Sequence, residues 1–331
     1  MTDWNQVEAT VSIGGSECKF TTIYLKQVFN GHHVFDIGVL CPPLPGENIW
    51  YNERESMIAM QGQSVVIRMR HVISGDESIF KGIITEIGMD GERGVSGTIH
   101  YRGCSPTVLL ESGKTMDSFM DYTLSAIVGE VVKNYGNGVE IVNKPLFNEQ
   151  IPYIQMHEET GYEFLRRIAY QYGEWFYYDG QKLHFGNPQK DKNETVTYDV
   201  ELETVSFGSR IAPFHYSRHD YMAEDDRPLY ADDSAGVNGI NTYLANAIRT
   251  SESVYQSPTT LYNKAIVGHP VHMNRLLEFE KGRDTASLVW LRGKSKTCCI
   301  RIGEPIAVKI PASMCNRRDL GQYRVMSVIH E

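Results

Sequence analysis

The chain has 331 residues, of which 41% are hydrophobic and 22% are charged, and it carries a formal net charge of −9. This length accommodates two or three domains with a sizeable buried core. The acidic balance argues against a nucleic-acid partner, because phosphates require clustered lysine and arginine. No apolar run approaches the roughly 20 residues needed to cross a bilayer, and the polar N-terminus lacks the pattern of a signal peptide.

The cysteines do not form a recognisable metal or redox motif. None of them is spaced as C-x-x-C, and a chain of this size does not need disulfides to supplement its core. We therefore expect free, buried thiols. The six residues are Cys18, Cys41, Cys104, Cys298, Cys299 and Cys315.

The first third of the chain, residues 7 to about 110, reads as short β-strands. Its apolar segments are rich in β-branched residues and are interrupted by glycine, proline and asparagine. The expected breaks are a loop at Pro42, Pro43 and Pro45 and turns at Gly75-Asp76 and Asp90-Gly91. Five or six strands at this spacing are typical of a barrel or a sandwich.

The character of the sequence changes at Ser112. Apolar residues near helical spacing predict a helix over Met116–Tyr135, which Gly136 ends. Pro145 and Pro152 bound a link that we expect to be irregular. We interpret residues 111–195 as an α+β unit between two β domains.

The clearest local pattern lies between residues 157 and 186. Thr160 and Glu163 form a capping box, in which each side chain satisfies a free amide at a helix start. An apolar helical face follows, made of Phe164, Leu165, Ile168, Ala169 and Tyr172. Gly173 stands where the helix should stop, because glycine accepts positive φ.

A hairpin is expected directly after this helix. Trp175–Tyr178, which includes Tyr177, reads as a strand by its aromatic content, and residues 182–185 read as its partner. Asp179-Gly180 between them is a strong signal for a two-residue turn in which both residues take φ > 0. Helix, stop and hairpin together form what we call the cassette, residues 157–186.

From about residue 196 the chain reads as β again. Residues 224–263 are polar and loop-like, Leu276–Leu291 favours a helix, and residues 297–311 and 322–331 favour strands. The last strand runs to Glu331 without a cap, so we expect the natural chain to continue.

One internal repeat is visible in the β segments. GQSVVIRM begins at Gly62 and GEPIAVKI begins at Gly303, an offset of 303 − 62 = 241 residues. At the same offset GIITEI, from Gly82, aligns with YRVMSV, from Tyr323. Two β segments that share register predict a duplicated barrel.

Two sequences resemble the end of a phosphate-binding loop but lack its first glycine. GKT at 113–115 and GKS at 293–295 would each need a glycine where Val108 and Leu288 stand. Both are better explained as turns, and we predict no nucleotide and no cofactor.

The histidine groups do not predict a metal site. They are His32-His33, His215 with His219, and His269 with His272. The H-x-x-x-H segment reads as a strand, Pro270 separates the third pair, and no H-E-x-x-H occurs. Surface or packing roles explain these residues better.

Nucleophiles and paired acids give no catalytic set either. Asp225-Asp226 and Asp232-Asp233 could be the paired acids of a glycosidase, but they lie in a polar loop. Cys298-Cys299 reads as strand residues with alternating faces. The aromatic run at 175–178 could bind sugar or peptide, although such a run more often covers a core on one face and an interface on the other.

In order along the chain, several of these segments resemble the VgrG family, the spike-hub proteins of type VI secretion, together with late-control D and contractile phage-tail hub proteins. The cassette, with FLRRIA followed by a glycine and an aromatic strand, carries the resemblance most specifically. GCSPTVLLESGKT, GKSKTCCIRIGEPIAVKIP and QYRVMSVIHE add to it. The signature residues are Thr160, Glu163, Phe164, Leu165, Ile168, Gly173, Tyr177 and Gly180.

The resemblance implies a β-rich α+β fold in which two similar β-barrel (tube) domains flank an α+β unit. The first hub barrel would span residues 1–110, the α+β linker 111–195 and the second hub barrel 196–331, and the C-terminal spike would be absent from this chain. Three chains would then form a ring of six barrels that matches a hexameric tube protein.

The implied function is structural rather than enzymatic. Such a hub adapts a hexameric tube to a trimeric spike for membrane puncture and effector delivery. Its partners would be two further copies of the chain, the tube protein, baseplate proteins, and the spike with its effectors. It would assemble in the cytoplasm and leave through the secretion machine without a signal peptide.

Three alternatives stay open on the sequence. The first is a phage-tail baseplate hub, which the sequence does not distinguish from a secretion hub. The second, from another class, is a cell-wall hydrolase, which would need convergent acids or a metal site. The third is a β-rich carbohydrate-binding module, for which only the aromatic residues argue.

Overall fold

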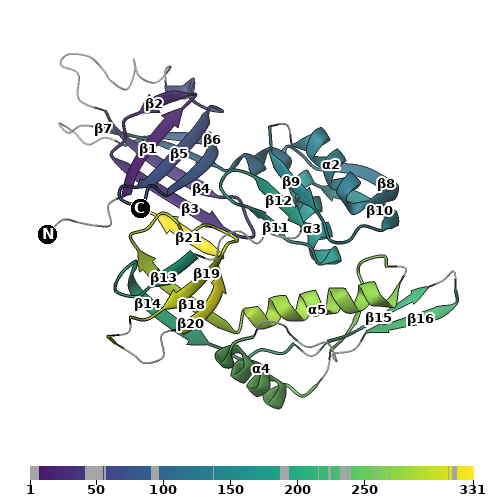
Figure 1. Ribbon diagram of the computed structural model, residues 1–331. Coiled ribbons are helices and arrows are strands. Elements are labelled where there is room, and N and C mark those ends of the chain that lie inside the picture. Colours follow the sequence, from purple (N-terminus) through teal and green to yellow (C-terminus); the bar gives the residue numbers. More distant parts are fainter. Residues whose placement is uncertain are drawn as a thin grey trace.

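The computed structural model describes residues 7–41, 55, 57–90, 97–136, 138–186, 194–214, 216–222, 225–231, 237, 240–257, 259–267, 269–311, 313–314 and 319–331 (Figure 1). Several residues named above lie outside these ranges, namely Pro42, Pro43, Pro45, Gly91, His215, Asp232, Asp233 and Cys315, as does the side chain of Cys41. The fold is β-rich with few helices. None of the described helices is both long and apolar enough to span a membrane.

The first region forms one antiparallel sheet of eight strands. Its strands are β1 (Val7–Ile13), β2 (Ser16–Cys18), β3 (Thr22–Val28), β4 (Val34–Cys41), β5 (Ser64–His71), β6 (Glu77–Asp90), β7 (Gly97–Cys104) and β21 (Ser327–His330). Their order is β2-β1-β5-β6-β7-β4-β3-β21, and within the described ranges no pairing closes this order into a ring. Alternate side chains point into the core, which includes Val11, Leu25, Ile37, Ile67, Phe80 and Ile84.

The last strand of the chain belongs to this first sheet. β21 pairs with β3, from Ser327 opposite Val28 to His330 opposite Leu25. The sheet therefore joins the two ends of the described chain, which lie near each other in Figure 1.

The middle region contains two packed helices and two small sheets. Its elements are the 3₁₀ turn η1 (Pro106–Glu111), β8 (Thr115–Thr123), α2 (Leu124–Tyr135), β9 (Ile141–Lys144), β10 (Gln150–Glu159), α3 (Gly161–Tyr172), β11 (Phe176–Tyr178) and β12 (Leu183–Gly186). β8 pairs with β10, and β12 lies between β11 and β9.

Two predictions for this region were wrong. Residues 116–123, predicted to be helical, form β8, and the helix begins only at Leu124, where the Thr123 hydroxyl accepts a hydrogen bond from the amide of Ala126. The link between Pro145 and Pro152 was expected to be irregular, yet its last residues, 150–152, belong to β10. Pro152 lies within β10, where its missing N–H is tolerated because, among the described strands, β10 pairs with β8 alone.

In the last region the described residues form three small sheets and two helices. Its elements are β13 (Glu194–Thr197), β14 (Leu202–Ser209), β15 (Tyr216–Met222), β16 (Arg227–Ala231), α4 (Thr242–Val254), β17 (Thr259–Tyr262), α5 (Pro270–Ala286), β18 (Val289–Ser295), β19 (Pro305–Lys309) and β20 (Asp319–Arg324). The sheets have the orders β13-β19-β20, β14-β18 and β16-β15-β17.

Three boundaries here differ from the sequence prediction. The segment 224–263, expected to be a loop, contains β16, α4 and β17, and Asn241 caps α4 by accepting from the amide of Leu244. The helix expected over Leu276–Leu291 begins earlier, at Pro270, and ends at Ala286. Residues 297–304, including Cys298-Cys299, are not a strand.

The two segments of the predicted repeat form hairpins with the same register. Val65 faces Gly82 in β5 and β6, and 241 residues later Ile306 faces Tyr323 in β19 and β20. Two hydrogen bonds recur as well. The Gly62 amide donates to the Ile84 carbonyl at 2.9 Å, as the Gly303 amide does to the Val325 carbonyl at 3.0 Å.

The backbone of the two hairpins agrees in a further detail. Gly62 and Gly303 take φ of 79° and 83°, a left-handed conformation that side chains other than glycine rarely adopt. Ile84 and Val325 are both buried. The predicted relation between these two segments is therefore confirmed at the level of the hairpin.

Candidate functional site

The cassette helix is capped at both ends as its sequence predicted. The Thr160 hydroxyl accepts from the Glu163 amide at 3.1 Å, and Glu163 accepts from the Thr160 amide at 3.0 Å. Gly173 ends the helix with φ of 67°. Phe164, Leu165 and Ile168 are fully buried.

The hairpin after the helix forms with a different turn from the one predicted. β11 and β12 pair from Tyr178 opposite Leu183, so four residues connect them instead of two. Of the predicted turn pair only Gly180 has positive φ, at 109°. Asp179 instead accepts from the amides of Gln181 and Lys182, each at 2.7 Å, and this Asx-type bonding sets the turn.

The turn is docked on the first sheet. The Lys81 amide of β6 donates to the Gly180 carbonyl at 2.8 Å, and the Tyr178 hydroxyl donates to the Lys81 carbonyl at 3.3 Å. A Cβ at residue 180 would stand 3.0 Å from the Ile79 carbonyl, so glycine also permits this close approach.

The aromatic run is the junction between the three regions. Trp175 packs against Phe29 after β3 and against Phe279 of α5, with ring centroids 5.3 and 6.2 Å apart. Tyr177 stacks on Phe29 at 4.8 Å, and a Cβ at Gly303 would lie only 2.4 Å from its ring. The cassette therefore holds the first sheet and the last region together through its strand.

Burial changes the pKa values of several groups at this junction. Burial lowers the pKa of His33, which packs beside Tyr178, to about 4. Burial alone would raise the pKa of Asp179, but hydrogen bonds from His184 and from the turn amides lower it overall. The Asp179–His184 contact is 2.6 Å long.

Two charged residues of the cassette have structural roles that the sequence did not reveal. Glu174 is 4% exposed and accepts from the amides of Leu146 and Phe147, each at 2.7 Å, while burial raises its pKa. Arg167 holds both carboxylate oxygens of Glu159 at 2.7 Å. The sequence shows an acidic residue directly after the helix stop at Gly173, which is a weak signal for a structural role of Glu174. It does not reveal the partners, because they are distant in sequence.

The sequence motifs for phosphate binding do not form phosphate loops. Residues 113–115 lead into strand β8, and residues 293–295 end strand β18, so neither precedes a helix. Residues 113–115 lead into the β8–β10 pair because the predicted helix over Met116–Tyr135 begins only at Leu124.

The histidines and acids do not converge. Within the described ranges no group of three or more His, Cys, Asp or Glu side chains is placed to hold a metal ion. His32 contacts Thr107 at 2.7 Å, and His272 contacts Glu149 at 3.2 Å. Asp226 bonds to the hydroxyl of Tyr221, and Asp225 lies 3.8 Å from Arg227.

The described cysteines are free thiols. Cys298 is buried, while Cys18, Cys104 and Cys299 are half-buried. Burial raises the pKa of all four, and that of Cys299 to about 11, which opposes thiolate formation.

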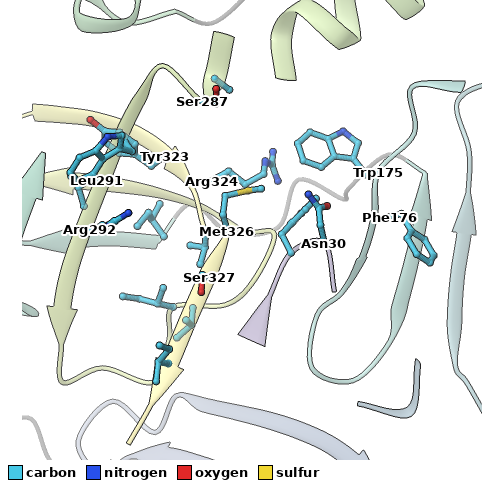
Figure 2. Close-up of a pocket in the computed structure, with 18 of the residues that line it drawn as sticks. Asn30, Trp175, Phe176, Ser287, Leu291, Arg292, Tyr323, Arg324, Met326 and Ser327 are labelled. Carbon is cyan, nitrogen blue, oxygen red and sulfur yellow. The ribbon is translucent and has the colours of Figure 1, made fainter. Parts of the chain in front are cut away.

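A large open groove of 3030 Å³ runs between the first sheet, the cassette and the last region (Figure 2). Trp175 and Asn30 lie on one side, and Leu291, Arg292 and Tyr323 on the other, with Arg324 between them. The Arg324 guanidinium lies 4.7 Å from the Trp175 ring centroid. The volume of the groove exceeds the roughly 300–1,000 Å³ of a small-molecule site.

Comparisons with known proteins agree with this architecture. Residues 53–201, a little under half of the chain, match the model of the phage tail baseplate hub (GPD) family. A search of curated proteins finds no match.

Solved structures resemble the whole chain at low identity. The 43 kDa tail protein of prophage MuSo2 from Shewanella oneidensis has a TM-score of 0.64 and 16% identity, covering 98% of this chain and 94% of that one. The tail protein of Neisseria meningitidis MC58 has a TM-score of 0.62 and 13% identity, covering 97% and 90%.

A secretion protein is also similar. The c3393 protein of E. coli, described as a component of the type VI secretion system with structural similarity to T4 phage tail proteins gp27 and gp5, has a TM-score of 0.53 and 12% identity. It covers 96% of this chain and 72% of that one. The chain therefore has the fold of these tail and secretion proteins, and its residues 53–201 match the phage tail baseplate hub family.

Proposed function

We propose that this protein is a structural hub of a phage tail or of a related contractile injection machine. The observation that carries the proposal is a fold that matches a prophage tail protein over 98% of this chain and 94% of the other. The family match over residues 53–201 supports the same role from the sequence alone. A hub performs no reaction, so the protein acts by shape, symmetry and rigidity.

The proposed assembly is a homotrimer in which each chain contributes two related β units. The repeated hairpins β5–β6 and β19–β20 support two such units, with residues 1–110 and 196–331 as hub barrels and residues 111–195 as the linker. Three chains then present six similar units to a hexameric tube protein. Baseplate proteins, a spike and its effectors are the further partners proposed.

The cassette is the proposed brace of this hub. Trp175 and Tyr177 contact both the first sheet and the last region, so a force applied to one region is transmitted to the other. The signature residues from Thr160 to Gly180 then serve to keep the helix and the hairpin in place.

Two machines are candidates, and the similarity to tail proteins favours the phage tail. The two tail proteins have TM-scores of 0.64 and 0.62 and are covered over 94% and 90% of their length, against 0.53 and 72% for the type VI secretion component. A secretion spike base that delivers effectors is the alternative, with assembly in the cytoplasm and export without a signal peptide.

The test is removal of the gene from its native genome, followed by electron microscopy of the particles. A hub is needed to nucleate the tube, so the deletion should abolish assembled tubes or tails, and the wild-type gene should restore them. Normal numbers of complete particles in the deletion strain would refute the proposal. The kind of particle that is lost distinguishes a phage tail from a secretion machine.

A further inference from the structure

The groove exposes a strand edge that has no partner among the described residues. β18 pairs only with β14, and on that side the Leu288 carbonyl accepts from the Arg210 amide at 2.8 Å. The Lys294 amide also points to β14, where it donates to the Thr204 hydroxyl at 3.1 Å. In an antiparallel pair alternate residues face the partner, so Leu291 and Gly293 direct their N–H and C=O groups away from β14.

This free edge belongs to the groove. Every residue of β18, Val289–Ser295, lines the groove, as do residues 322–331 on its other wall. Leu291 and Arg292 appear beside Tyr323 in the close-up of Figure 2. An unpaired edge of this kind is a template for an added strand.

The internal repeat indicates a second position without a strand partner among the described residues, on β20 at the opposite wall of the groove. In the first hairpin Ile84 faces β5, while Ile83 pairs with Cys104 of β7 on the opposite side. The residue of β20 equivalent to Ile83 is Arg324. A strand equivalent to β7 would bind the backbone N–H and C=O groups of Arg324. β3 takes this place only from Met326 onward, where the Phe29 amide donates to the Met326 carbonyl at 2.9 Å.

Three arginine side chains line the groove without a carboxylate partner within the described ranges. Arg292 lies 4.9 Å from the Trp290 ring centroid, Arg324 lies over Trp175, and Arg210 donates to the carbonyl and hydroxyl of Ser287 at 3.1 and 2.9 Å. In the described part of the chain none of these three guanidinium groups has a carboxylate within ion-pair distance. On a chain with a net charge of −9, this local positive charge is complementary to an acidic ligand.

We propose that the groove binds an extended acidic segment of a partner protein, which adds as a strand to the free edge of β18 and places its carboxylates on Arg292 and Arg324. Main-chain hydrogen bonds to Leu291 and Gly293 provide the affinity common to any strand, and the guanidinium groups provide selection for acidic side chains. Leu291, whose side chain lies on the opposite face of β18 from Arg292, lines the same groove and meets the alternate apolar side chains of the segment. This binding does not depend on the hub role.

The probe is an acetylated octapeptide that alternates valine and glutamate, added to the full chain labelled with ¹⁵N. At saturation the amides of Leu291 and Gly293 should exchange with deuterium at least about tenfold more slowly, because they become hydrogen-bonded. The same peptide with N-methyl groups along one edge should lose this protection. Unchanged exchange at both amides, or equal protection by the N-methylated peptide, would overturn the proposal.

Charge selection is tested by fluorescence anisotropy with the labelled probe. Arg292→Glu should weaken binding about tenfold, because an attractive contact becomes repulsive. Arg249→Glu is the matched control, since Arg249 lies on α4 outside the groove lining and is exposed, and its affinity should equal that of the wild type. Equal losses in both variants, or equal binding of the valine–lysine octapeptide, would contradict selection for an acidic segment.

A second copy of the chain is the competing occupant. If it fills the edge, the Leu291 and Gly293 amides will already be protected without peptide and will lose protection on dilution. That result would overturn the proposed partner. Fast exchange at every protein concentration without peptide, followed by protection with peptide, supports it.

Discussion

A buried ion pair fastens the β16-β15-β17 sheet to α5. Arg218 of β15 donates from Nε to Glu280 of α5 at 2.9 Å, and its Nη1 donates to the Tyr262 carbonyl of β17 at 3.2 Å. The two charged side chains are only 9% and 10% exposed. Removal of one partner from such a pair leaves a buried charge uncompensated, which costs far more than the loss of a surface pair.

Arg218→Met should therefore lower the free energy of unfolding by about 3–5 kcal/mol. Arg68→Met is the matched control, because the Arg68–Glu77 pair has side chains 55% and 39% exposed. That change should cost at most about 1 kcal/mol. Urea denaturation of both variants measures the difference, and equal losses would contradict the importance of the buried pair.

Burial of His33 makes stability depend on pH. Its side chain is fully buried, its Nδ1 lies 3.2 Å from the Gln27 amide nitrogen, and its pKa is lowered to about 4. Between pH 4 and about 6.5 the unfolded chain therefore binds a proton that the native protein does not, so stability falls as the pH falls through this window. Over the whole window this lowers the free energy of unfolding by about 3 kcal/mol.

His33→Gln should remove that contribution. The difference in unfolding free energy between pH 7 and pH 4 should be about 3 kcal/mol smaller in the variant than in the wild type. Urea midpoints measured at half-unit pH steps give both curves. Parallel curves for the two proteins would show that His33 takes up its proton in the native state.

At the residue scale the sequence predicted local chemistry better than distant contacts. Thr160, Glu163 and Gly173 act within one helix, and their spacing was sufficient to predict their roles. Glu174 could not be interpreted in this way, because its partners Leu146 and Phe147 precede it by a whole strand and helix. The turn after Asp179 is longer than the predicted two-residue turn, because the Asp179 carboxylate accepts hydrogen bonds from amides of its own loop.

At the scale of elements the stop of α3 is also a packing contact. Gly173 has φ of 67°, and a Cβ there would lie 3.2 Å from Phe279 and 3.3 Å from Leu276 of α5. Gly129, in the interior of α2, is exposed and has open space around its missing Cβ. The two glycines therefore differ in what alanine would do.

Gly173→Ala should destabilise the protein by about 1–2 kcal/mol, because a left-handed conformation becomes strained. Gly129→Ala should stabilise it by about 0.5–1 kcal/mol, because alanine costs less conformational entropy in a helix. Thermal or urea unfolding of the pair decides the signs. A stabilising Gly173→Ala would contradict the assigned role of this residue as the helix stop.

Helices and strands were predicted wrongly where the spacing of apolar residues does not distinguish the helical period of 3.6 residues from the strand period of 2. Residues 116–123 carry apolar side chains that a helix could use, yet pairing with β10 buries only Phe119 and leaves Met116 and Met120 exposed. The helix α4 was missed because its sequence is polar, and it buries only Ala247 and Ser251. In both cases a neighbour distant in sequence decides the conformation.

At the scale of the whole molecule the repeat is the most informative feature. The offset of 241 residues correctly predicted two hairpins of equal register, because strand pairing preserves residue spacing. It did not predict that β21 joins the first sheet, since a repeat carries no information on contacts between its copies.

The two copies should respond differently to the same mutation. Gly62 and Gly303 share positive φ, but a Cβ at Gly303 would lie 2.4 Å from the Tyr177 ring, whereas Gly62 has open space. Gly62→Ala should cost about 1–2 kcal/mol from backbone strain alone, and Gly303→Ala should cost more. Equal losses in urea unfolding would mean that Tyr177 does not brace the second hairpin.

We propose that three copies of this chain build a hub with approximate sixfold symmetry. The most direct measurement is single-particle electron cryomicroscopy of the purified protein at high concentration, because a trimer dissociates on dilution. We expect a closed ring of three chains in which β5–β6 and β19–β20 hairpins alternate at similar radius around the axis. A monomer at every concentration, or a ring in which these hairpins occupy unrelated positions, would contradict it.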